Sequence, residues 1–346
     1  MTSPPPPVSL LPWAEATLNV SGNDATPDIS PVAGDASSRS YYRAVLNGRS
    51  YILMVAPPAS ENNAAFVAAR DRLARADVRV PAIIAVDYAR GYLLLEDLGE
   101  QLLLSALNPD TADGLYRRAF GVLASLAAAD IRGGTLAPYD NALLREEFGR
   151  FDTWFVRTLL EHPPDAVAAR VCDDLCELLV NSALEQPRVL VHRDFHSRNL
   201  MLTPHGALAV IDFQDAVAGP LTYDLVSLLR DCYIRWPAAQ VTQWALGYRA
   251  VLLDANVVAV PDETRFLRWF DLMGLHRHIK VLGTFARLAL RDGKRAYLDD
   301  LPLVLAYVEQ ILARYAPDEP VVARFRDWFT ADILPAVDAQ AWGRRA

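Results

Sequence analysis

The chain has 346 residues, 52% hydrophobic and 22% charged, a composition typical of a globular protein long enough for two domains. The formal net charge of -8 argues against binding to nucleic acid or to an anionic membrane surface, because both require a basic face. The chain has only three cysteines, which favours a protein without disulfide bonds. It has no apolar run long enough to span a bilayer and no basic signal-like start, so we expect a cytoplasmic protein.

The predicted elements of the first 98 residues are mainly strands. A proline-rich lead-in, residues 1–8, is expected to be disordered, and a short amphipathic helix follows over residues 10–20. β-rich runs occupy residues 28–55, and Asn47-Gly48 predicts a tight hairpin between two of them. A helix with Ser60 as its N-cap precedes two further strands, AIIAVDY and GYLLLED.

Helical periodicity dominates from residue 99 to the end, apart from the island VLVHRDFHSRNLMLTPHGALAVIDFQD. Cys172 and Cys176 lie four residues apart on one predicted helix and are interpreted as core residues rather than metal ligands. The sequence therefore predicts an α+β protein of two lobes. Residues 9–98 form the small antiparallel-sheet lobe, and residues 99–346 form the large helical lobe.

The island contains a spaced set of polar residues that fits phosphoryl transfer. His192-Arg193-Asp194 is followed by Asn199 five residues after the aspartate, and then by Asp212-Phe213. Phosphoryl transfer needs a carboxylate at the acceptor hydroxyl and oxygen ligands for Mg²⁺ on the phosphates. A single such acid is more often a solvated loop residue, but the combined spacing favours a catalytic role.

Two segments, VHRDFHSRNLML and VIDFQDAVAGPLTYDLVSLLRD, resemble the aminoglycoside phosphotransferase-like branch of the protein-kinase-like fold. Four others, GDASSRSYYR, LMVAPP, LLLEDLG and HRHIKVLGTFARLALRDGKRAYLDDLP, resemble bacterial anomeric sugar kinases acting on N-acetylmuramate and N-acetylglucosamine in cell-wall recycling. The resemblance implies a bilobal kinase with ATP and Mg²⁺ as cofactors, whose products are sugar 1-phosphates. It also implies that residues 9–98 are the nucleotide-binding lobe and residues 99–346 the catalytic and substrate-binding lobe.

The resemblance also implies a role for individual residues. Asp194 corresponds to the catalytic base, and Asn199 and Asp212 to the metal ligands. The segment from Glu96 to Leu98 corresponds to the hinge that offers backbone groups to adenine. The supporting residues of the catalytic loop would be His192 and Asp224, although Asp224 is equally explained as an acid that complements a helix dipole.

The segment GDASSRSYY occupies the place of a glycine-rich phosphate loop but has one glycine, so Ser37 and Ser38 are expected to donate to phosphate. The lysine that kinases carry on the third strand is replaced by Met54, and residues 9–98 contain no lysine. Arg43, or less strongly Arg39, is expected to take its place, unless both are ordinary exposed strand cations. The sequence assigns no role to Glu61.

Residues 271–292 are rich in cations, which indicates either a solvated helix face or an anion site near Asp194. On the second interpretation Arg277 and Lys280, together with His196, bind the substrate, and the cations read the lactyl carboxylate of N-acetylmuramate.

Two alternatives stay open at this point. One is a kinase of the same fold acting on an aminoglycoside or another small alcohol, and the other is a catalytically silent nucleotide-binding module. No nucleic acid, membrane or protein partner is indicated by the sequence.

Overall fold

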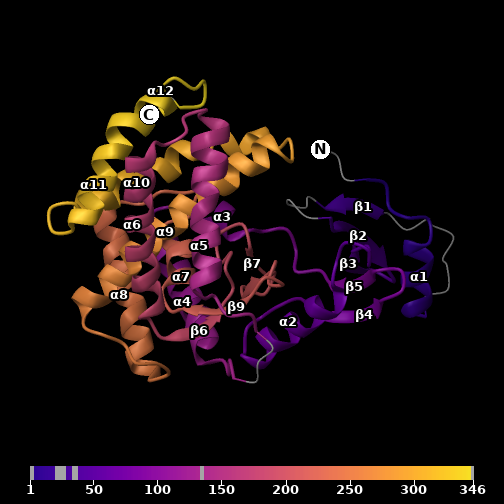
Figure 1. Cartoon of the computed structure of the whole chain (residues 1–346). Coiled ribbons are helices and arrows are strands. Elements are labelled where there is room, and N and C mark those ends of the chain that lie inside the picture. Colours follow the sequence, from indigo (N-terminus) through magenta and orange to yellow (C-terminus); the bar gives the residue numbers. More distant parts are fainter. Residues whose placement is uncertain (1–3, 20–28, 33–37, 133–135, 344–346) are drawn as a thin grey trace. The chain divides into compact units, whose positions relative to one another are not determined.

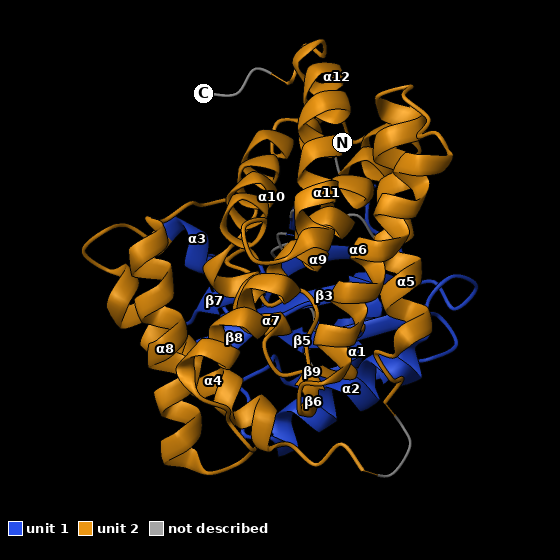
Figure 2. Ribbon diagram, turned by 60° about the vertical axis from the view of Figure 1, so that its left-hand side comes forward, with its two compact units in different colours: residues 1–105, 199–214 blue, residues 106–198, 215–346 orange. Residues whose placement is uncertain are grey.

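The computed structural model describes residues 4–19, 29–32, 38–132 and 136–343. The chain divides into two compact units, one of residues 1–105 with 199–214 and the other of residues 106–198 with 215–346 (Figure 1, Figure 2). The expected boundary after residue 98 differs from this division, because a hairpin from the middle of the sequence belongs to unit 1. Its backbone bonds explain why: Leu202 donates to the Gln101 carbonyl and Val210 to the Arg79 carbonyl, both at 2.8 Å.

Unit 1 contains a five-stranded antiparallel sheet, as the sequence predicted, and its strands lie in the order β1-β2-β3-β5-β4. Asn47 and Gly48 join β2 to β3 with positive φ angles of 50° and 72°, which two-residue hairpin turns require. The strands and helices of unit 1 are α1 (Leu10–Thr17), β1 (Ile29–Val32), β2 (Ser40–Leu46), β3 (Arg49–Val55), α2 (Asn63–Arg75), β4 (Ile83–Asp87), β5 (Tyr92–Glu96), α3 (Leu103–Ala106, which ends at the boundary), β7 (Leu200–Leu202) and β8 (Leu208–Val210).

The two faces of this sheet have different roles. Alternate residues of β2 (Tyr42, Ala44 and Leu46) share a buried core cluster with Leu10 and Ala14 of α1. The opposite face carries Tyr41 and Arg43, because successive side chains of a strand point to opposite sides. Tyr41 pairs with Met54 across β2 and β3, so the side chains of this pair lie on that second face.

The start of α2 corrects one expectation. The N-cap is Asn62, whose side chain accepts a hydrogen bond from the Ala65 N–H at 3.0 Å. Ser60 was expected in this position, but its N–H bonds to the Pro57 carbonyl at 3.0 Å in the preceding turn. The turn therefore delays the helix by two residues.

The proline-rich lead-in is described from Pro4 onward. The Tyr42 hydroxyl donates to the Pro4 carbonyl at 2.8 Å, and the Leu10 N–H donates to the Pro7 carbonyl at 2.9 Å. These bonds tie the end of the segment to the sheet and to α1.

Unit 2 is mainly helical and contains one two-stranded antiparallel sheet, β6 with β9. Sequence patterning predicted its main helices but not β9 or the π-helical turns. The elements are α4 (Ala112–Ala128), α5 (Asn141–Arg150), η1 (Phe151–Leu159), α6 (Ala166–Leu184), β6 (Arg188–Val191), β9 (Val217–Pro220), α7 (Tyr223–Leu229), α8 (Ala238–Ala255), α9 (Glu263–Leu290), η2 (Arg295–Leu298), α10 (Leu301–Tyr315), α11 (Pro320–Trp328), η3 (Phe329–Ile333) and α12 (Leu334–Asp338).

Helix α9 forms the centre of unit 2. It packs against α5, α6, α7, α8, α10 and η1, and most of its residues are buried. At Gly283 the helix passes so close to the end of α5 that an added Cβ would lie 2.2 Å from the backbone carbon of Arg150. Glycine at this position therefore sets how closely α9 can approach α5 and η1.

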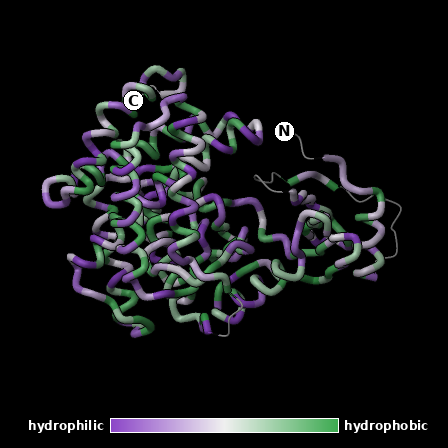
Figure 3. Tube along the Cα trace, viewed as in Figure 1, coloured by the Kyte–Doolittle hydropathy of each residue, from purple (hydrophilic) through white to green (hydrophobic). Residues whose placement is uncertain are grey.

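Hydrophobic and hydrophilic residues are interspersed along the helices of each unit (Figure 3). Within the described ranges, no helix has both the length and the apolar character needed to cross a membrane.

Two glycine-to-alanine substitutions in helices should have opposite effects on stability. Gly283→Ala should lower the free energy of unfolding by about 1–3 kcal/mol, because its Cβ would meet the Arg150 backbone, which cannot give way. Gly121→Ala in α4 should raise it by up to about 1 kcal/mol, because the added Cβ meets no atom within 4 Å and alanine is the better helix former. Urea unfolding of both variants checks this, and equal effects would contradict the close approach at Gly283.

Candidate active site

The loop after β6 carries the candidate catalytic residue Asp194, and its backbone is held by Asp224. This carboxylate, in the first turn of α7, accepts hydrogen bonds from the N–H groups of His192 at 2.6 Å and of Arg193 at 3.0 Å. Asp224 is 4% exposed, and burial, which these bonds only partly offset, raises its pKa to about 6. The carboxylate thus fixes the backbone immediately before Asp194.

A second aspartate, which the sequence analysis missed, holds the other side of the same loop. Asp231, two residues beyond α7, accepts from the Ser197 N–H at 2.8 Å and from the Tyr233 N–H at 3.1 Å. Asp231 is buried, so these N–H donors replace the water that its carboxylate gives up. Nothing in the sequence distinguishes it from an ordinary acid near a helix end.

Arg193 adopts a left-handed backbone conformation, with a φ of 76°, that non-glycine residues rarely take. Its guanidinium pairs with Glu147 of α5, a fully buried carboxylate that also accepts from the Tyr139 hydroxyl. Burial opposes ionisation of Glu147, but Lys280 and Arg193 outweigh it and lower its pKa to about 2. This second missed acid therefore stays charged and helps to hold the strained turn of the loop.

Asp194 is partly buried among positive charges. Burial alone would raise its pKa, but the positive charges of Lys280 and Arg277 outweigh this effect and hold the pKa below its ordinary value. His196 packs edge-on against Tyr233 with the ring centroids 5.4 Å apart, and burial lowers its pKa. At neutral pH Asp194 is therefore a carboxylate and His196 is neutral.

Four cations of the run are buried in α9, so the interpretation as a solvated helix face is wrong for His276, Arg277, His278 and Lys280, whereas Arg291 after the helix is exposed. His276 and His278 bond to the backbone carbonyls of Leu144 and Arg230, each at 3.0 Å. Burial lowers their pKa values to about 4 and about 3, which makes both neutral structural residues. The run contains so many polar residues because α9 meets polar groups of its neighbours on several sides.

Lys280 and Arg277, the two expected substrate-binding residues of α9, have different surroundings. The ammonium of Lys280 lies 2.9 Å from a Glu147 carboxylate oxygen and donates to the Tyr223 hydroxyl at 2.9 Å. Arg277 donates to the Cys232 sulfur at 3.5 Å, and Asp194 is among the groups that raise its pKa. The contacts of Lys280 therefore favour a positioning role, and Arg277 is the better candidate for substrate.

Unit 1 contains the two expected metal ligands at the base of the β7–β8 hairpin. The Ile211 N–H donates to the Asn199 carbonyl at 3.0 Å, and the amide nitrogen of Asn199 lies 3.5 Å from a carboxylate oxygen of Asp212. Asp212 has a positive φ of 61° and also accepts from the Gln214 side chain at 2.8 Å. The hairpin thus brings together two residues that are 13 positions apart.

This pair fits Mg²⁺, which prefers oxygen ligands and is usually held by one or two carboxylates together with substrate phosphates and water. Asn199 and Asp212 each offer an oxygen. Across the described residues no group of three or more His, Cys, Asp and Glu side chains could hold a metal ion, so a closed protein cage is not formed there.

The expected adenine-binding segment lies at the end of β5. The Glu96 side chain pairs with Arg79 and accepts from the Ala82 N–H at 3.1 Å, while its own N–H donates to the Ala82 carbonyl at 2.9 Å. Among the described residues, the backbone N–H and C=O of Leu98 make no hydrogen bond. Leu98 is therefore better placed than Glu96 to offer backbone groups to a base.

The contacts of Arg43 argue against its expected phosphate-binding role. Its guanidinium donates to Asp97 at 2.6 and 3.1 Å, to the Gly99 carbonyl at 2.9 Å, and to Glu100. Burial raises the pKa of Asp97, but its bonds from Arg43, Ser50 and the Gly99 N–H dominate and lower it. Arg43 therefore stabilises the turn after β5.

The phosphate-loop region is described only in part, and Ser37 lies outside the described residues. The Ser38 hydroxyl, expected to donate to phosphate, donates to the Glu61 carboxylate. The same carboxylate pairs with Arg39 at 2.8 Å, and both side chains are largely buried. Glu61 thus has partners that the sequence did not predict.

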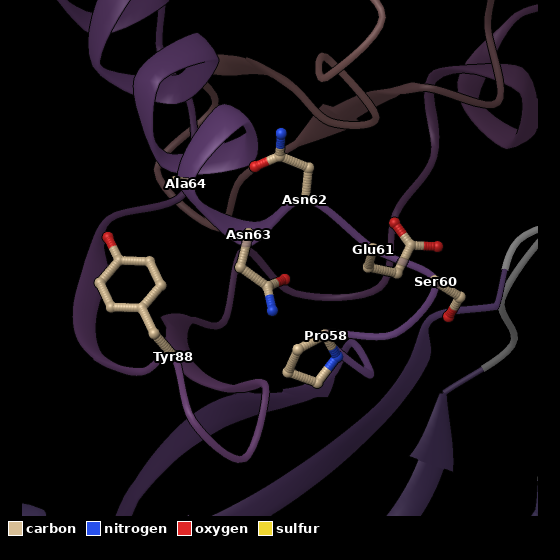
Figure 4. Close-up of a pocket in the computed structure, with 7 residues that line it drawn as sticks. All are labelled: Pro58, Ser60, Glu61, Asn62, Asn63, Ala64 and Tyr88. Carbon is tan, nitrogen blue, oxygen red and sulfur yellow. The ribbon is translucent and has the colours of Figure 1, made fainter.

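A hollow in unit 1 lies beside Glu61 but has no basic side chain among its lining residues, and we assign no ligand to it. It is lined by Pro58, Ser60, Glu61, Asn62, Asn63, Ala64 and Tyr88 (Figure 4).

Taken with the sheet-bearing unit 1, the braced Asp194 loop and the Asn199–Asp212 pair define a phosphotransferase with a protein-kinase-like fold. Residues 28–270 match the phosphotransferase enzyme family. The chain belongs to this family, which confirms both the predicted fold class and the predicted type of enzyme.

Several curated relatives are similar over most of their length. A protein of Pseudomonas putida named N-acetylmuramate/N-acetylglucosamine kinase is 42% identical over 297 residues, which cover 86% of this chain and 87% of the relative. A protein of the same name from Neisseria meningitidis is 36% identical, with 86% of this chain and 89% of the relative covered. Another protein of this name, from Caulobacter vibrioides, is 31% identical, with 86% of this chain and 90% of the relative covered.

Solved structures confirm the fold at low sequence identity. The ADP-bound aminoglycoside phosphotransferase APH(2'')-Ib has a TM-score of 0.58 and 12% identity, covering 88% of this chain and 98% of that chain. The choline kinase LicA from Streptococcus pneumoniae has a TM-score of 0.60 and 14% identity, and the match covers 87% of this chain and 98% of LicA.

Asp224→Asn should lower kcat about 10- to 100-fold. Asparagine has one acceptor oxygen where two N–H groups need one each, so the loop before Asp194 should shift. The affinity for Mg-ATP should change less than threefold, because Asn199 and Asp212 belong to the other unit. Steady-state kinetics and calorimetry separate the two effects, and an unchanged kcat would contradict the bracing role.

The pH dependence of the stability of Asp224→Asn provides a second test of the Asp224 environment. Because the folded-state pKa of Asp224 is raised from 3.8 to about 6, the folded chain binds this proton more tightly than the unfolded chain. Wild-type stability relative to Asp224→Asn should therefore be highest below pH 3.8 and fall by up to about 3 kcal/mol as the pH rises to about 6. Urea unfolding across this range measures the difference, which would be flat if the pKa were ordinary.

Proposed function

We propose that this protein transfers the γ-phosphoryl group of ATP to the anomeric C1 hydroxyl of N-acetylmuramate and N-acetylglucosamine, giving sugar 1-phosphates for the recycling of peptidoglycan precursors. The observation that carries the proposal is the agreement among relatives: proteins 31–42% identical over 83–86% of this chain carry the name of a kinase of these two sugars. The geometry around Asp194 supports the chemistry.

Asp194 is proposed as the base that orients the C1 hydroxyl and accepts its proton. A hemiacetal hydroxyl is more acidic than an ordinary alcohol because of the ring oxygen, so a carboxylate suffices as the acceptor. The positive charges of Lys280 and Arg277 keep Asp194 ionised. The loop bonds to Asp224 and Asp231 hold it in place while the proton moves.

Asn199 and Asp212 are proposed to hold Mg²⁺ on the nucleotide phosphates, and the Leu98 backbone to bind adenine. When bound, the metal ion offsets the negative charge that phosphoryl transfer places on the phosphate oxygens. Asp194 and Asn199 are five residues apart on one continuous segment, which is the spacing that the reaction needs between base and metal ligand.

Arg277 is proposed to read the lactyl carboxylate that N-acetylmuramate has and N-acetylglucosamine lacks. Its fork of donors suits a carboxylate, and its charge acts on Asp194. His196, neutral at physiological pH, is proposed as a hydrogen-bonding partner for a sugar hydroxyl. Lys280 is not proposed as a substrate ligand, because its ammonium pairs with Glu147 and donates to the Tyr223 hydroxyl.

The cations around Asp194 disfavour a polycationic aminoglycoside as the acceptor, since like charges near the base would repel it. A silent nucleotide-binding module is disfavoured by the presence of Asp194, Asn199 and Asp212 together.

Asp194→Asn should reduce kcat by about 10²- to 10⁴-fold and change the affinity for Mg-ATP less than threefold, because it removes the proton acceptor and little of the side-chain volume. Single-turnover transfer to N-acetylglucosamine and calorimetry with Mg-ATP measure the two quantities. Asp173→Asn, which removes an exposed charge from α6, is the matched control and should leave both unchanged. Near-normal turnover by Asp194→Asn would show that this loop does not supply the base.

The product should be a phosphate ester at C1. Phosphate on an acetal carbon leaves in warm dilute acid through an oxocarbenium ion, whereas phosphate on a ring or primary alcohol survives this treatment. The methyl glycoside of N-acetylglucosamine should not be phosphorylated, because its C1 oxygen carries no proton. Mass detection of the product before and after acid treatment checks both points, and an acid-stable product would move the assignment to another hydroxyl.

A further inference from the structure

The sheet of unit 1 lacks the cation that kinases place on β3. Met54 of β3 is fully buried, and the only lysines of the chain are Lys280 and Lys294, both outside unit 1. Nucleotide phosphates bound beside this sheet still need a positive side chain, because Mg²⁺ offsets only part of their charge. A residue of unit 1 other than lysine must therefore supply this positive charge.

Arg39 lies immediately before β2, next to the face that a lysine at position 54 would have used. Tyr41 pairs directly with Met54, so these two side chains lie on one face of the sheet. Arg39 is two residues before Tyr41, and its guanidinium donates a hydrogen bond to the Tyr41 hydroxyl. Arg39 therefore approaches the position of the missing ammonium from the neighbouring strand.

Glu61 holds Arg39 in this position. A carboxylate oxygen of Glu61 lies 2.8 Å from a terminal guanidinium nitrogen of Arg39, and the two side chains are only 12% and 8% exposed. The Ser38 hydroxyl donates to the same carboxylate. In Figure 4 the Glu61 carboxylate points away from Tyr88, the residue on the opposite side of the hollow. An ion pair this shielded from water fixes the guanidinium more firmly than an exposed pair would.

Arg39 is also linked to Asp212, the proposed metal ligand. Its guanidinium lies over the Phe66 ring, 5.3 Å from the centroid, and Phe66 packs on Phe213 with the centroids 5.0 Å apart. Phe213 follows Asp212 in the chain, and the charge of Asp212 acts on Tyr41. The same group of residues therefore contains the metal ligand and Arg39.

We propose that Arg39, positioned by Glu61, is the phosphate-binding cation of this protein and replaces the absent β3 lysine from the adjacent strand. A guanidinium has five N–H donors in a planar fork, so it can bond to Glu61 and to a phosphate oxygen at the same time. The inference rests on the proposed function only in requiring that the chain binds a nucleoside triphosphate.

Arg43 lies in β2, four residues beyond Arg39, and has different partners. Asp97, Glu100 and the Gly99 carbonyl take up its donors at the turn after β5. Arg43 in β2 and Arg39 just before this strand are thus distinguished by the carboxylates that contact them.

Nucleotide binding to the purified full chain tests the proposal without any sugar. Arg39→Ala should weaken the affinity for the non-hydrolysable analogue Mg-AMPPNP about 10- to 100-fold and leave the affinity for adenosine within threefold, because only the phosphate contact is lost. Arg49→Ala is the matched control: it removes an exposed arginine at the start of β3 and should leave both affinities unchanged.

A rescue experiment separates the phosphate role from a merely structural one. Met54→Lys alone should not raise the affinity for Mg-AMPPNP, because Arg39 already pairs with the Glu61 carboxylate. Met54→Lys in the Arg39→Ala background should recover at least a third of the lost binding free energy for Mg-AMPPNP, since the new ammonium can pair with the vacated Glu61. Glu61→Gln should weaken Mg-AMPPNP binding less than Arg39→Ala does, because the charge of Arg39 remains.

An Arg39→Ala protein with wild-type affinity for Mg-AMPPNP would overturn the proposal, and so would an equal loss of affinity for adenosine. If Arg39→Ala does not fold, as judged by thermal unfolding, Arg39→Gln decides. It keeps a long polar side chain but loses the charge, so an affinity for Mg-AMPPNP equal to wild type, or an equal loss for adenosine, would count against Arg39. Failure of sugar phosphorylation in the wild-type protein would refute the proposed function alone, because these measurements contain no sugar.

Discussion

Three buried carboxylates hold the loop that carries Asp194, and the remainder of the site depends on keeping their charges matched. Asp224 and Asp231 accept backbone N–H groups on either side of Asp194, while Glu147 binds Arg193 and Lys280. Removing one partner of such a buried set typically costs about 3–5 kcal/mol, because the other charge is left without compensation. The loop can therefore hold the left-handed turn at Arg193, whose geometry is unfavourable in isolation.

Helix α9 connects this loop to the core of unit 2. It supplies Lys280 to Glu147 and Arg277 to the surroundings of Asp194, and its histidines bond to backbone carbonyls. Its position is limited by Gly283, which allows close contact with the end of α5. Since α5 also carries Glu147, the distance between the two helices sets the geometry of the Glu147–Lys280 pair.

Three ion pairs of unit 1 have arginine as the cation. Arg43 stabilises the turn beside Leu98, Arg79 pairs with Glu96, and Arg39 pairs with Glu61. Arginine is suited to such sites because its planar fork bonds to two acceptors at once and stays charged when buried. The absence of lysine from this unit is thus compatible with a nucleotide site, provided that a guanidinium reaches the phosphates.

The sequence by itself determined the five-stranded antiparallel sheet and the helical unit 2, because hydrophobic periodicity and the Asn47-Gly48 turn are local signals. Fixed spacing also picked out Asp194, Asn199 and Asp212 as candidates, since the reaction needs these residue types in that order.

Only the tertiary structure decided which charges meet. Glu147, Asp231 and Glu61 look like ordinary surface acids in the sequence, and the α9 cations look solvated. The structure buries Glu147, Asp231 and four cations of α9, and it pairs Glu61 with Arg39. Ion pairs form between residues distant in the chain and depend on a few ångströms of packing, whereas hydrophobic periodicity reports only which face of an element is apolar.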